Sequence, residues 1–176
     1  MKKTNERAGK SGIIQFIDEI FTKKGYDREL EIHKIEHIVR EYEVDEDHLD
    51  ALSVAIKTNE DITRIFKTLV LLNEKKEMIV ACIPGLEKLD LKKLAKISGS
   101  KKVEMLPMKD LFSMTGYLRG GCSPIAIKKR HTAFIHNSAT DNETILISGG
   151  LRGLQIEISP QKLIDYLNLI VADIIE

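Results

Sequence analysis

A chain of 176 residues is long enough to bury an apolar core as one domain without metals or disulfides to hold it together. Apolar residues make up 43% of it and charged residues 31%, the balance of an ordinary globular protein. Lysine plus arginine and aspartate plus glutamate each number 27, which excludes a protein that wraps duplex nucleic acid through a general positive field; any contact with RNA must be local.

The cysteines and the N-terminal segment indicate a protein of the reducing cytoplasm. Cys82 and Cys122 lack a CxxC neighbour and the spacing of metal ligands, so we expect neither a zinc site nor a disulfide framework. His33 and His37 would share one face of a strand, but no third ligand is in register with them. The sequence has no run of the roughly 18 apolar residues that a membrane span needs, and no signal peptide is expected. We therefore predict a cytoplasmic protein without a metal, a cofactor or a membrane attachment.

Residues 1–10 are polar and are expected to be flexible, whereas residues 11–176 are expected to form a single domain. In the first half of the chain, apolar spacing predicts a helix that starts at Ser11 and stops at Gly25. Two apolar runs on either side of a polar turn at Asn73 predict a hairpin. The predicted elements of this half are helices over residues 11–24 and 46–57 and strands over residues 29–36, 65–73 and 78–84.

The second half mixes short helices with strands. Asp90 is expected to cap a helix that Gly99 ends, and Ser159 with Pro160 is expected to begin the last helix. That last helix would bury one face, made of Leu163, Ile164, Leu167 and Ile170. The other predicted elements are a short helix over residues 108–114 and strands over residues 101–106, 131–136, 143–148 and 152–158. Because hairpins and helices do not alternate as βαβ units, the order indicates an α+β fold with a mixed, barrel-like sheet flanked by helices.

A glycine pair is the most informative local feature, since Gly120 and Gly121 directly precede Cys122, Ser123 and Pro124. Adjacent glycines adopt positive φ and let backbone amides approach a ligand closely. Successive N–H groups in such a turn bind a phosphate or a developing oxyanion. Pro124 would fix the exit of the turn. The alternative is a tight hairpin in which the glycines serve backbone geometry alone.

Lys67 is a candidate for binding an anion. It lies inside an apolar strand-like run, and burying an uncompensated ammonium is costly, so it must reach solvent, a partner or an anionic ligand. Strand alternation places it beside Leu69 and Leu71, on an otherwise apolar side, which favours a position in a cleft. The alternative is a lysine on the solvated face of a half-buried strand.

Three further features carry weaker signals. Lys128, Lys129 and Arg130 form a compact basic cluster that would suit a phosphate backbone, although such runs also occur on solvated faces. Ser148 precedes a second glycine turn and would either donate to a substrate carbonyl or cap that turn. Cys122 would need a positioned base to act as a nucleophile, and no Cys/His/Asn spacing supplies one.

Several separated segments agree with one known family. They are residues 66–69 (FKTL), 89–95 (LDLKKLA), 101–105 (KKVEM), 115–124 (TGYLRGGCSP), 128–129 (KK) and 148–154 (SGGLRGL). Their order and nearly ungapped spacing, from Ile65 to Glu176, resemble the YbaK family. Its members are Cys-tRNA(Pro)/Cys-tRNA(Cys) deacylases, relatives of the editing domain inserted in bacterial prolyl-tRNA synthetases.

The resemblance implies a fold, a reaction and partners. The fold would be a mixed, barrel-like sheet flanked by helices, with the glycine turn and Lys67 lining one cleft. The reaction would be trans-editing: removal of mischarged cysteine from tRNA(Pro), and by extension from tRNA(Cys), without a metal or a protein nucleophile. In this family the thiol of the substrate attacks its own ester carbonyl. The neutral net charge suggests weak tRNA affinity of the chain alone, so prolyl-tRNA synthetase is the expected partner.

The resemblance also implies residue roles. Lys67 would hold the terminal phosphate or ribose of the tRNA, and the amides of Gly120 and Gly121 would polarise the ester carbonyl. Ser148 would contact the aminoacyl group. The remaining expected contacts are the shaping of the turn by Ser123 and Pro124 and tRNA binding by Lys128, Lys129 and Arg130.

Two positions in the expected substrate site depart from the family pattern. Ile35 stands where many deacylases carry tyrosine, and Gln155 stands where they carry aspartate, which removes a charge that could bind the α-amino group of the substrate. The segment from His37 to Arg64 is longer than usual, so substrate selectivity could reside there. These departures leave open which amino acid the protein would remove from tRNA. They also leave an alternative function, a catalytically lapsed tRNA- or synthetase-binding module or a regulatory protein.

Overall fold

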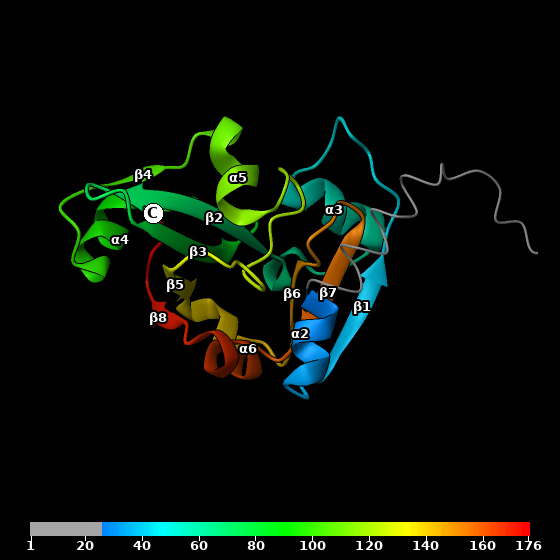
Figure 1. The fold of residues 1–176 in the computed structure, drawn as a ribbon. Helices are drawn as coiled ribbons and strands as arrows, with labels where there is room; N and C mark the ends of the chain where they lie inside the picture. Colours follow the sequence, from blue (N-terminus) through cyan, green and yellow to red (C-terminus); the bar gives the residue numbers. More distant parts are fainter. Residues whose placement is uncertain (1–25) are drawn as a thin grey trace, which may run out of the picture.

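The computed structural model describes residues 26–176, which form two β-sheets flanked by helices (Figure 1). The predicted flexible segment over residues 1–10 and the predicted helix over residues 11–24 lie outside the described residues. The strands are β1 (His37–Glu41), β2 (Phe66–Asn73), β3 (Met78–Pro84), β4 (Val103–Met105), β5 (His131–His136), β6 (Ile145–Ser148), β7 (Leu154–Ile158) and β8 (Ile170–Ala172). The helices are α2 (Tyr26–Ile32), α3 (Ala51–Thr58), α4 (Leu91–Ser98), α5 (Leu111–Thr115) and α6 (Pro160–Leu167), with 3₁₀ turns η1 (Ile62–Arg64), η2 (Met108–Asp110) and η3 (Asn137–Asp141). None of these helices is long and apolar enough to cross a membrane.

The larger sheet is built on the predicted hairpin of β2 and β3, whose register pairs Phe66 with Pro84. The side chain of Asn73 closes the turn, because its Oδ1 accepts hydrogen bonds from the N–H groups of Lys75 and Glu77, each at 2.9 Å. β3 is buried along nearly its whole length and therefore takes the centre of the sheet, as continuous apolar strands do. The strand order is β4-β2-β3-β5-β8, with β4 antiparallel to β2 and β5 parallel to β3.

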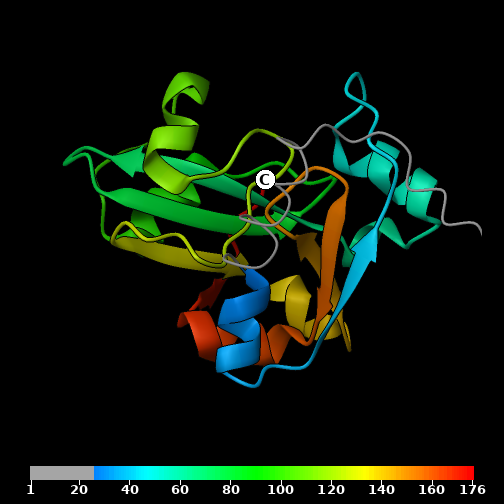
Figure 2. The ribbon, with the colours of Figure 1, turned by 45° about the vertical axis from the view of Figure 1, so that its right-hand side comes forward.

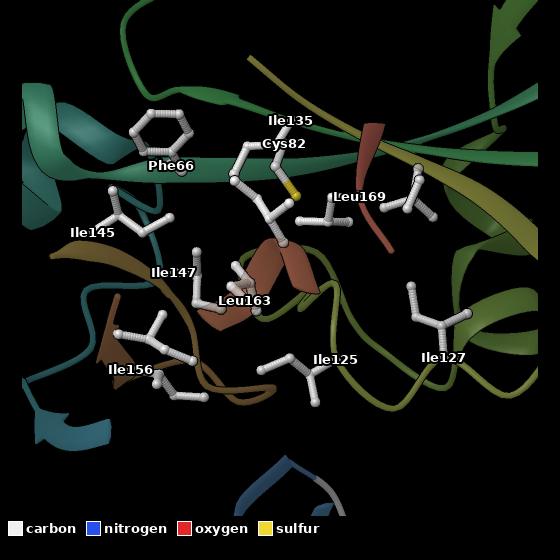
Figure 3. Close-up of a cluster of buried hydrophobic side chains, with 14 of the residues drawn as sticks. Phe66, Cys82, Ile125, Ile127, Ile135, Ile145, Ile147, Ile156, Leu163 and Leu169 are labelled. Atoms are coloured by element: carbon white, nitrogen blue, oxygen red, sulfur yellow. The ribbon is translucent and has the colours of Figure 1, made fainter. Parts of the chain in front are cut away.

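The smaller sheet has the order β1-β7-β6, and it meets the larger one where Ile65, just before β2, forms a parallel bridge with Leu146 of β6. The main core lies between the two sheets (Figure 3). It includes Phe66, Cys82, Ile125, Ile145, Ile147, Ile156 and Leu163, each at most 2% exposed. The α+β class with a mixed sheet is confirmed. The barrel-like closure is not observed, because β1 and β8 remain outer strands of separate sheets.

The opposite face of β2 and β3 packs against α4, where Leu71 and Leu94 are both fully buried. The carboxylate of Asp90 accepts hydrogen bonds from the first turn of α4, at 3.0 Å from the N–H of Lys93. Gly99 ends the helix with a φ of +68°, the left-handed conformation that favours glycine. Both predicted ends of this helix are therefore confirmed.

The predicted strand over residues 29–36 is wrong. Its first half is the end of α2, and the strand β1 begins only at His37. Leu30 of α2 is fully buried in the main core, and the Tyr166 hydroxyl donates to Glu29 at 3.0 Å. Packing against α6 thus outweighs the alternating apolar pattern that favoured a strand. Lys34, with a φ of +54°, then separates the helix from β1.

The last predicted helix is shorter than expected. α6 ends at Leu167 because Asn168 adopts the left-handed conformation with a φ of +51°. Ile170, which was expected on the buried face of the helix, instead begins β8 and pairs with Phe134 of β5.

A charged cluster fixes the junction of the sheets. Arg64, next to Ile65, donates to Glu157 of β7 at 2.6 Å, and Arg40 of β1 donates to the same carboxylate at 2.8 Å. The Thr144 hydroxyl adds a third hydrogen bond to it at 2.7 Å. Burial would raise the pKa of Glu157, but these hydrogen bonds outweigh it and lower the pKa to about 2.

Replacing Glu157 should make the unfolding free energy depend less on pH in the acid range. The folded pKa of Glu157 is about 2, below its ordinary 4.5, so its contribution is complete above that ordinary value and is lost as the pH falls towards the folded value. The full shift corresponds to at most about 3 kcal/mol. Urea denaturation across this pH range should show a lower unfolding free energy for Glu157→Gln at neutral pH and a shallower decline in acid. Glu104→Gln, at an exposed carboxylate, is the matched control and should follow the wild type. Equal acid slopes for wild type and Glu157→Gln would contradict the assignment.

Candidate functional site

A cavity of about 590 Å³ lies along the edge of β2. β4 covers that edge only from Val70 onward, so the preceding residues of β2 present an uncovered strand edge. Consecutive residues from Ile65 to Val70 line the cavity, together with the ends of β6 and β7 and the loop around Gly120. A cavity of this size fits a small-molecule group such as an aminoacyl ester.

Lys67 lines this cavity and is half-buried. Its Nζ donates a hydrogen bond to the Gly85 carbonyl oxygen at 2.9 Å. Loss of solvation lowers the pKa of Lys67, and the nearby charge of Glu87 opposes that effect. Within residues 26–176 no carboxylate comes within ion-pair distance of its Nζ. The ammonium therefore keeps donors available for a ligand in the cavity.

Gly120 lines the same cavity as Lys67. Its φ of +83° favours glycine, and a Cβ there would lie 3.3 Å from Leu49 of the segment before α3. Arg152 holds the loop in place: its Nε donates to the Arg119 carbonyl oxygen at 2.8 Å, and its Nη1 forms an ion pair with Glu46. The backbone of Gly120 thus has a fixed position at the cavity wall.

Gly121 differs from its expected role. Its N–H donates to the Leu118 carbonyl oxygen at 3.0 Å, and the residue is buried and does not line the cavity. A Cβ at this position would lie 3.2 Å from the backbone of Leu151 and Arg152. The absence of a side chain therefore allows two backbone segments to pack closely, and the amide is already engaged in the turn.

Ser123 and Pro124 are buried behind the cavity and do not line it. The Ser123 Oγ accepts a hydrogen bond from the Ile125 N–H at 3.2 Å, and the Tyr117 hydroxyl donates to the Ile125 carbonyl oxygen at 2.5 Å. These bonds fix the path of the chain after the glycine pair.

Ser148 and Gln155 are direct cross-strand partners on β6 and β7, and both line the cavity. The Ser148 Oγ accepts from the Gly150 N–H at 3.2 Å, which leaves its own proton free to donate. The Gln155 side chain is only 4% exposed, and its Oε1 has no hydrogen-bond partner among the described residues. Ser148 thus offers a donor at the cavity, whereas the unsatisfied Gln155 oxygen is itself buried.

The two cysteines have different surroundings. Cys82 is fully buried in the core, as its apolar context indicates. Cys122 lines the cavity, and burial raises its pKa to about 12, so at neutral pH it is a protonated thiol and a weak nucleophile. In the described part of the chain no three histidine, cysteine or acidic residues lie close enough together to hold a metal.

Besides Gly121, Ser123 and Pro124, four more of the expected site residues lie outside the cavity. Ile35 packs against the main core between α2 and β1. Lys128, Lys129 and Arg130 are exposed on the segment before β5. Lys129 contacts α5, since its Nζ lies 3.2 Å from the Met114 Sδ.

The wall opposite β2 was not identified from sequence. It comes from the segment leading into α3 and from α3 itself, including Leu49, Asp50 and Val54. Arg119 and Thr68 also line the cavity. The unusual length of the segment from 37 to 64 was the only signal, and only the fold shows that this segment faces β2.

The unsatisfied oxygen of Gln155 generates a stability prediction. Gln155→Leu removes a buried acceptor that has no partner, so the unfolding free energy should stay the same or rise by about 1 kcal/mol. Asn73→Leu is the matched control, because both the oxygen and the nitrogen of the buried Asn73 side chain are hydrogen-bonded, and it should lose about 1–3 kcal/mol. Denaturant unfolding measures both variants. A loss for Gln155→Leu as large as that for Asn73→Leu would show that the Gln155 oxygen has a partner in solution.

Comparisons with known proteins connect the chain to one family. The family model of the aminoacyl-tRNA editing domain matches residues 45–166, which include every described residue that lines the cavity except Tyr42. A protein of Enterococcus faecalis with the provisional name Cys-tRNA(Pro)/Cys-tRNA(Cys) deacylase EbsC is 48% identical over 141 residues, covering 80% of this chain and 86% of that protein.

Two crystal structures share the fold. One is described as the hypothetical protein APE2540, with a TM-score of 0.79 and 19% identity over 85% of this chain and 98% of that chain. The other is provisionally described as a trans-editing enzyme for prolyl-tRNA synthetase, with a TM-score of 0.73 and 19% identity over 96% of this chain and 99% of that chain. At this identity the two structures support the fold alone. The match over residues 45–166 and the 48% identical relative show that the chain belongs to the aminoacyl-tRNA editing domain family.

Proposed function

We propose that this protein is a trans-editing deacylase that cleaves the ester of mischarged aminoacyl-tRNA, with cysteinyl-tRNA(Pro) as its substrate. One observation carries the proposal: Lys67 and Gly120 line one cavity together with Ser148 and Gln155, in a chain of the aminoacyl-tRNA editing family. The 48% identical relative bears the name of a Cys-tRNA(Pro)/Cys-tRNA(Cys) deacylase, which supports cysteine as the amino acid removed and tRNA(Cys) as a second substrate.

Each of these four residues in the cavity has a separate role in binding or catalysis. The ammonium of Lys67 binds the terminal ribose or phosphate of the tRNA, as a point charge suits an anion. The N–H of Gly120 polarises the ester carbonyl and stabilises the oxyanion, an effect of about 3–4 kcal/mol for a preorganised donor. Ser148 donates to the aminoacyl group. Gln155 accepts from its α-amino group once the side-chain amide turns its oxygen, which has no partner among the described residues, towards the cavity.

The substrate supplies the nucleophile. Cys122 is protonated at neutral pH, so the protein has no activated thiol in the cavity. In cysteinyl-tRNA the thiolate of the substrate attacks its own ester carbonyl: a carbon–sulfur bond forms, the bond to the ribose oxygen breaks, and that oxygen takes up a proton. The released product is a thiolactone. The protein then contributes orientation and oxyanion stabilisation.

A synthetase partner completes the proposal. The chain carries 27 basic and 27 acidic residues, so its own attraction for tRNA is local and weak. We propose that prolyl-tRNA synthetase, in the cytoplasm, delivers the mischarged tRNA, and that Lys128, Lys129 and Arg130 contact its backbone.

A deacylation panel tests this function. Wild-type protein should release cysteine from tRNA(Pro) faster than serine or alanine, because only cysteine carries the attacking thiol. Lys67→Ala should lower kcat/KM at least about tenfold, since it removes a charged hydrogen-bond donor from the substrate. Lys96→Ala is the matched control: Lys96 is an exposed lysine on α4, a helix that contributes no residue to the cavity, and this variant should keep wild-type activity.

The same panel separates the competing candidate, a binding module that has lost catalysis. The neutral Gln155 at a position where the family carries aspartate is the observation that favours this candidate. No ester loss above background for any aminoacyl-tRNA, with tRNA or synthetase binding retained, would overturn the deacylase proposal in its favour.

A further inference from the structure

Three apolar side chains are exposed next to the cavity. Met105 at the end of β4 is 48% exposed, and Met108 and Phe112 of the η2–α5 segment are 58% and 54% exposed. Met105 and Met108 also line the cavity. Single exposed apolar residues are common, but a group of them at the mouth of a cavity marks a contact surface.

The η2–α5 segment presents two of these side chains together. η2 runs directly into α5, so Met108 and Phe112 are four residues apart in a nearly continuous helical stretch and share one face. α5 projects beyond the sheet in both views of the ribbon (Figure 1 and Figure 2). Gly116, with a φ of +82°, ends the helix there. The segment therefore forms a projecting ledge beside the cavity.

Positive charge borders this ledge. Lys109 of η2 is exposed, and the Lys129 Nζ lies 3.2 Å from the Met114 Sδ of α5. The exposed Lys128 and Arg130 flank Lys129 in the chain. Because the whole chain has no net charge, this local cluster is the feature that would attract a polyanion to the ledge.

We propose that Met105, Met108 and Phe112 form a stacking platform for the unpaired bases at the 3′ end of the tRNA, with Lys109 and Lys128–Arg130 contacting its phosphates. The proposal rests on the proposed function, because an ester held in the cavity places the adjoining single-stranded nucleotides at the cavity mouth. Aromatic side chains beside cations are the elements with which proteins hold single-stranded RNA irrespective of its sequence, and the two methionines extend the apolar surface around Phe112. Continuity with the cavity and the basic border favour RNA over a protein partner as the occupant.

The experiment measures binding of uncharged tRNA(Pro) by fluorescence anisotropy, so it needs no catalysis. Phe112→Ala should weaken binding about five- to fiftyfold, the effect of losing one base stack. Phe112→Tyr keeps the ring and should bind as the wild type, whereas Phe112→Leu keeps the apolar surface without the ring and should resemble Phe112→Ala. Ile97→Ala, at a 41% exposed position on α4, is the matched control and should have no effect. Because Phe112 is also exposed, none of these changes disturbs the core.

A tRNA shortened at its 3′ end shows which part of the tRNA the platform contacts. Removing the last three nucleotides should weaken binding to the wild type and leave no further loss for Phe112→Ala, since both changes delete the same contact. Equal affinity of wild type and Phe112→Ala for intact tRNA would overturn the platform. If Phe112→Ala binds tRNA more weakly than the wild type only when prolyl-tRNA synthetase is present, the ledge contacts a protein partner. That result would also overturn the platform.

Deacylation kinetics separate this inference from the proposed function. If both hold, Phe112→Ala raises KM for cysteinyl-tRNA(Pro) and leaves kcat unchanged, because the ledge lies outside the reacting group. Wild-type activity with an unchanged KM in the variant would reject the platform alone. Ring-dependent tRNA binding without any ester cleavage would reject the deacylase proposal and keep the RNA contact.

Discussion

The bridge between Ile65 and Leu146 is the constraint on which the rest of the molecule depends. It joins the two sheets at the start of β2, so the uncovered edge of that strand faces the ends of β6 and β7. Glu157 and the two arginines that surround it hold the junction, and the main core fills the angle behind it. Groups that are far apart in the chain, such as Lys67 and Gln155, meet in one cavity only because this junction forms.

In the part of the chain that the structure describes, the cavity offers binding groups and no strong nucleophile. Lys67 with its half-buried ammonium, Gly120, Ser148 and Gln155 line it, and burial keeps the thiol of Cys122 protonated. Such a site accelerates a reaction by orienting a substrate that carries its own attacking group and by stabilising the charge that develops. The neutral Gln155 and the wall from α3 are where this chain would adjust the choice of amino acid.

Sequence reasoning succeeded where local signals determine structure. The hairpin at Asn73, the capped helix from Asp90 to Gly99 and the shared cavity position of Lys67 and Gly120 follow from patterns within a few residues or from the family motifs. It failed where contacts between segments far apart in the sequence determine the structure. Residues 29–32 are helical because Leu30 and Glu29 pack on α6, and Ile170 enters a strand because β5 has a free edge for it. The engagement of the Gly121 amide and the wall from α3 likewise depend on which segments the fold brings together.

The most direct test of the account is the location of the bound ester. Titrating the protein with a cysteinyl-adenosine analogue whose ester is replaced by an uncleavable amide, and following backbone amide signals by NMR, would map it. If the ester binds in the cavity, shifts are expected at Gly120, Ser148 and Gln155, and they should be lost in Lys67→Ala. Shifts confined to the separate hollow lined by His136 and Asn142, with none at Gly120, would contradict it.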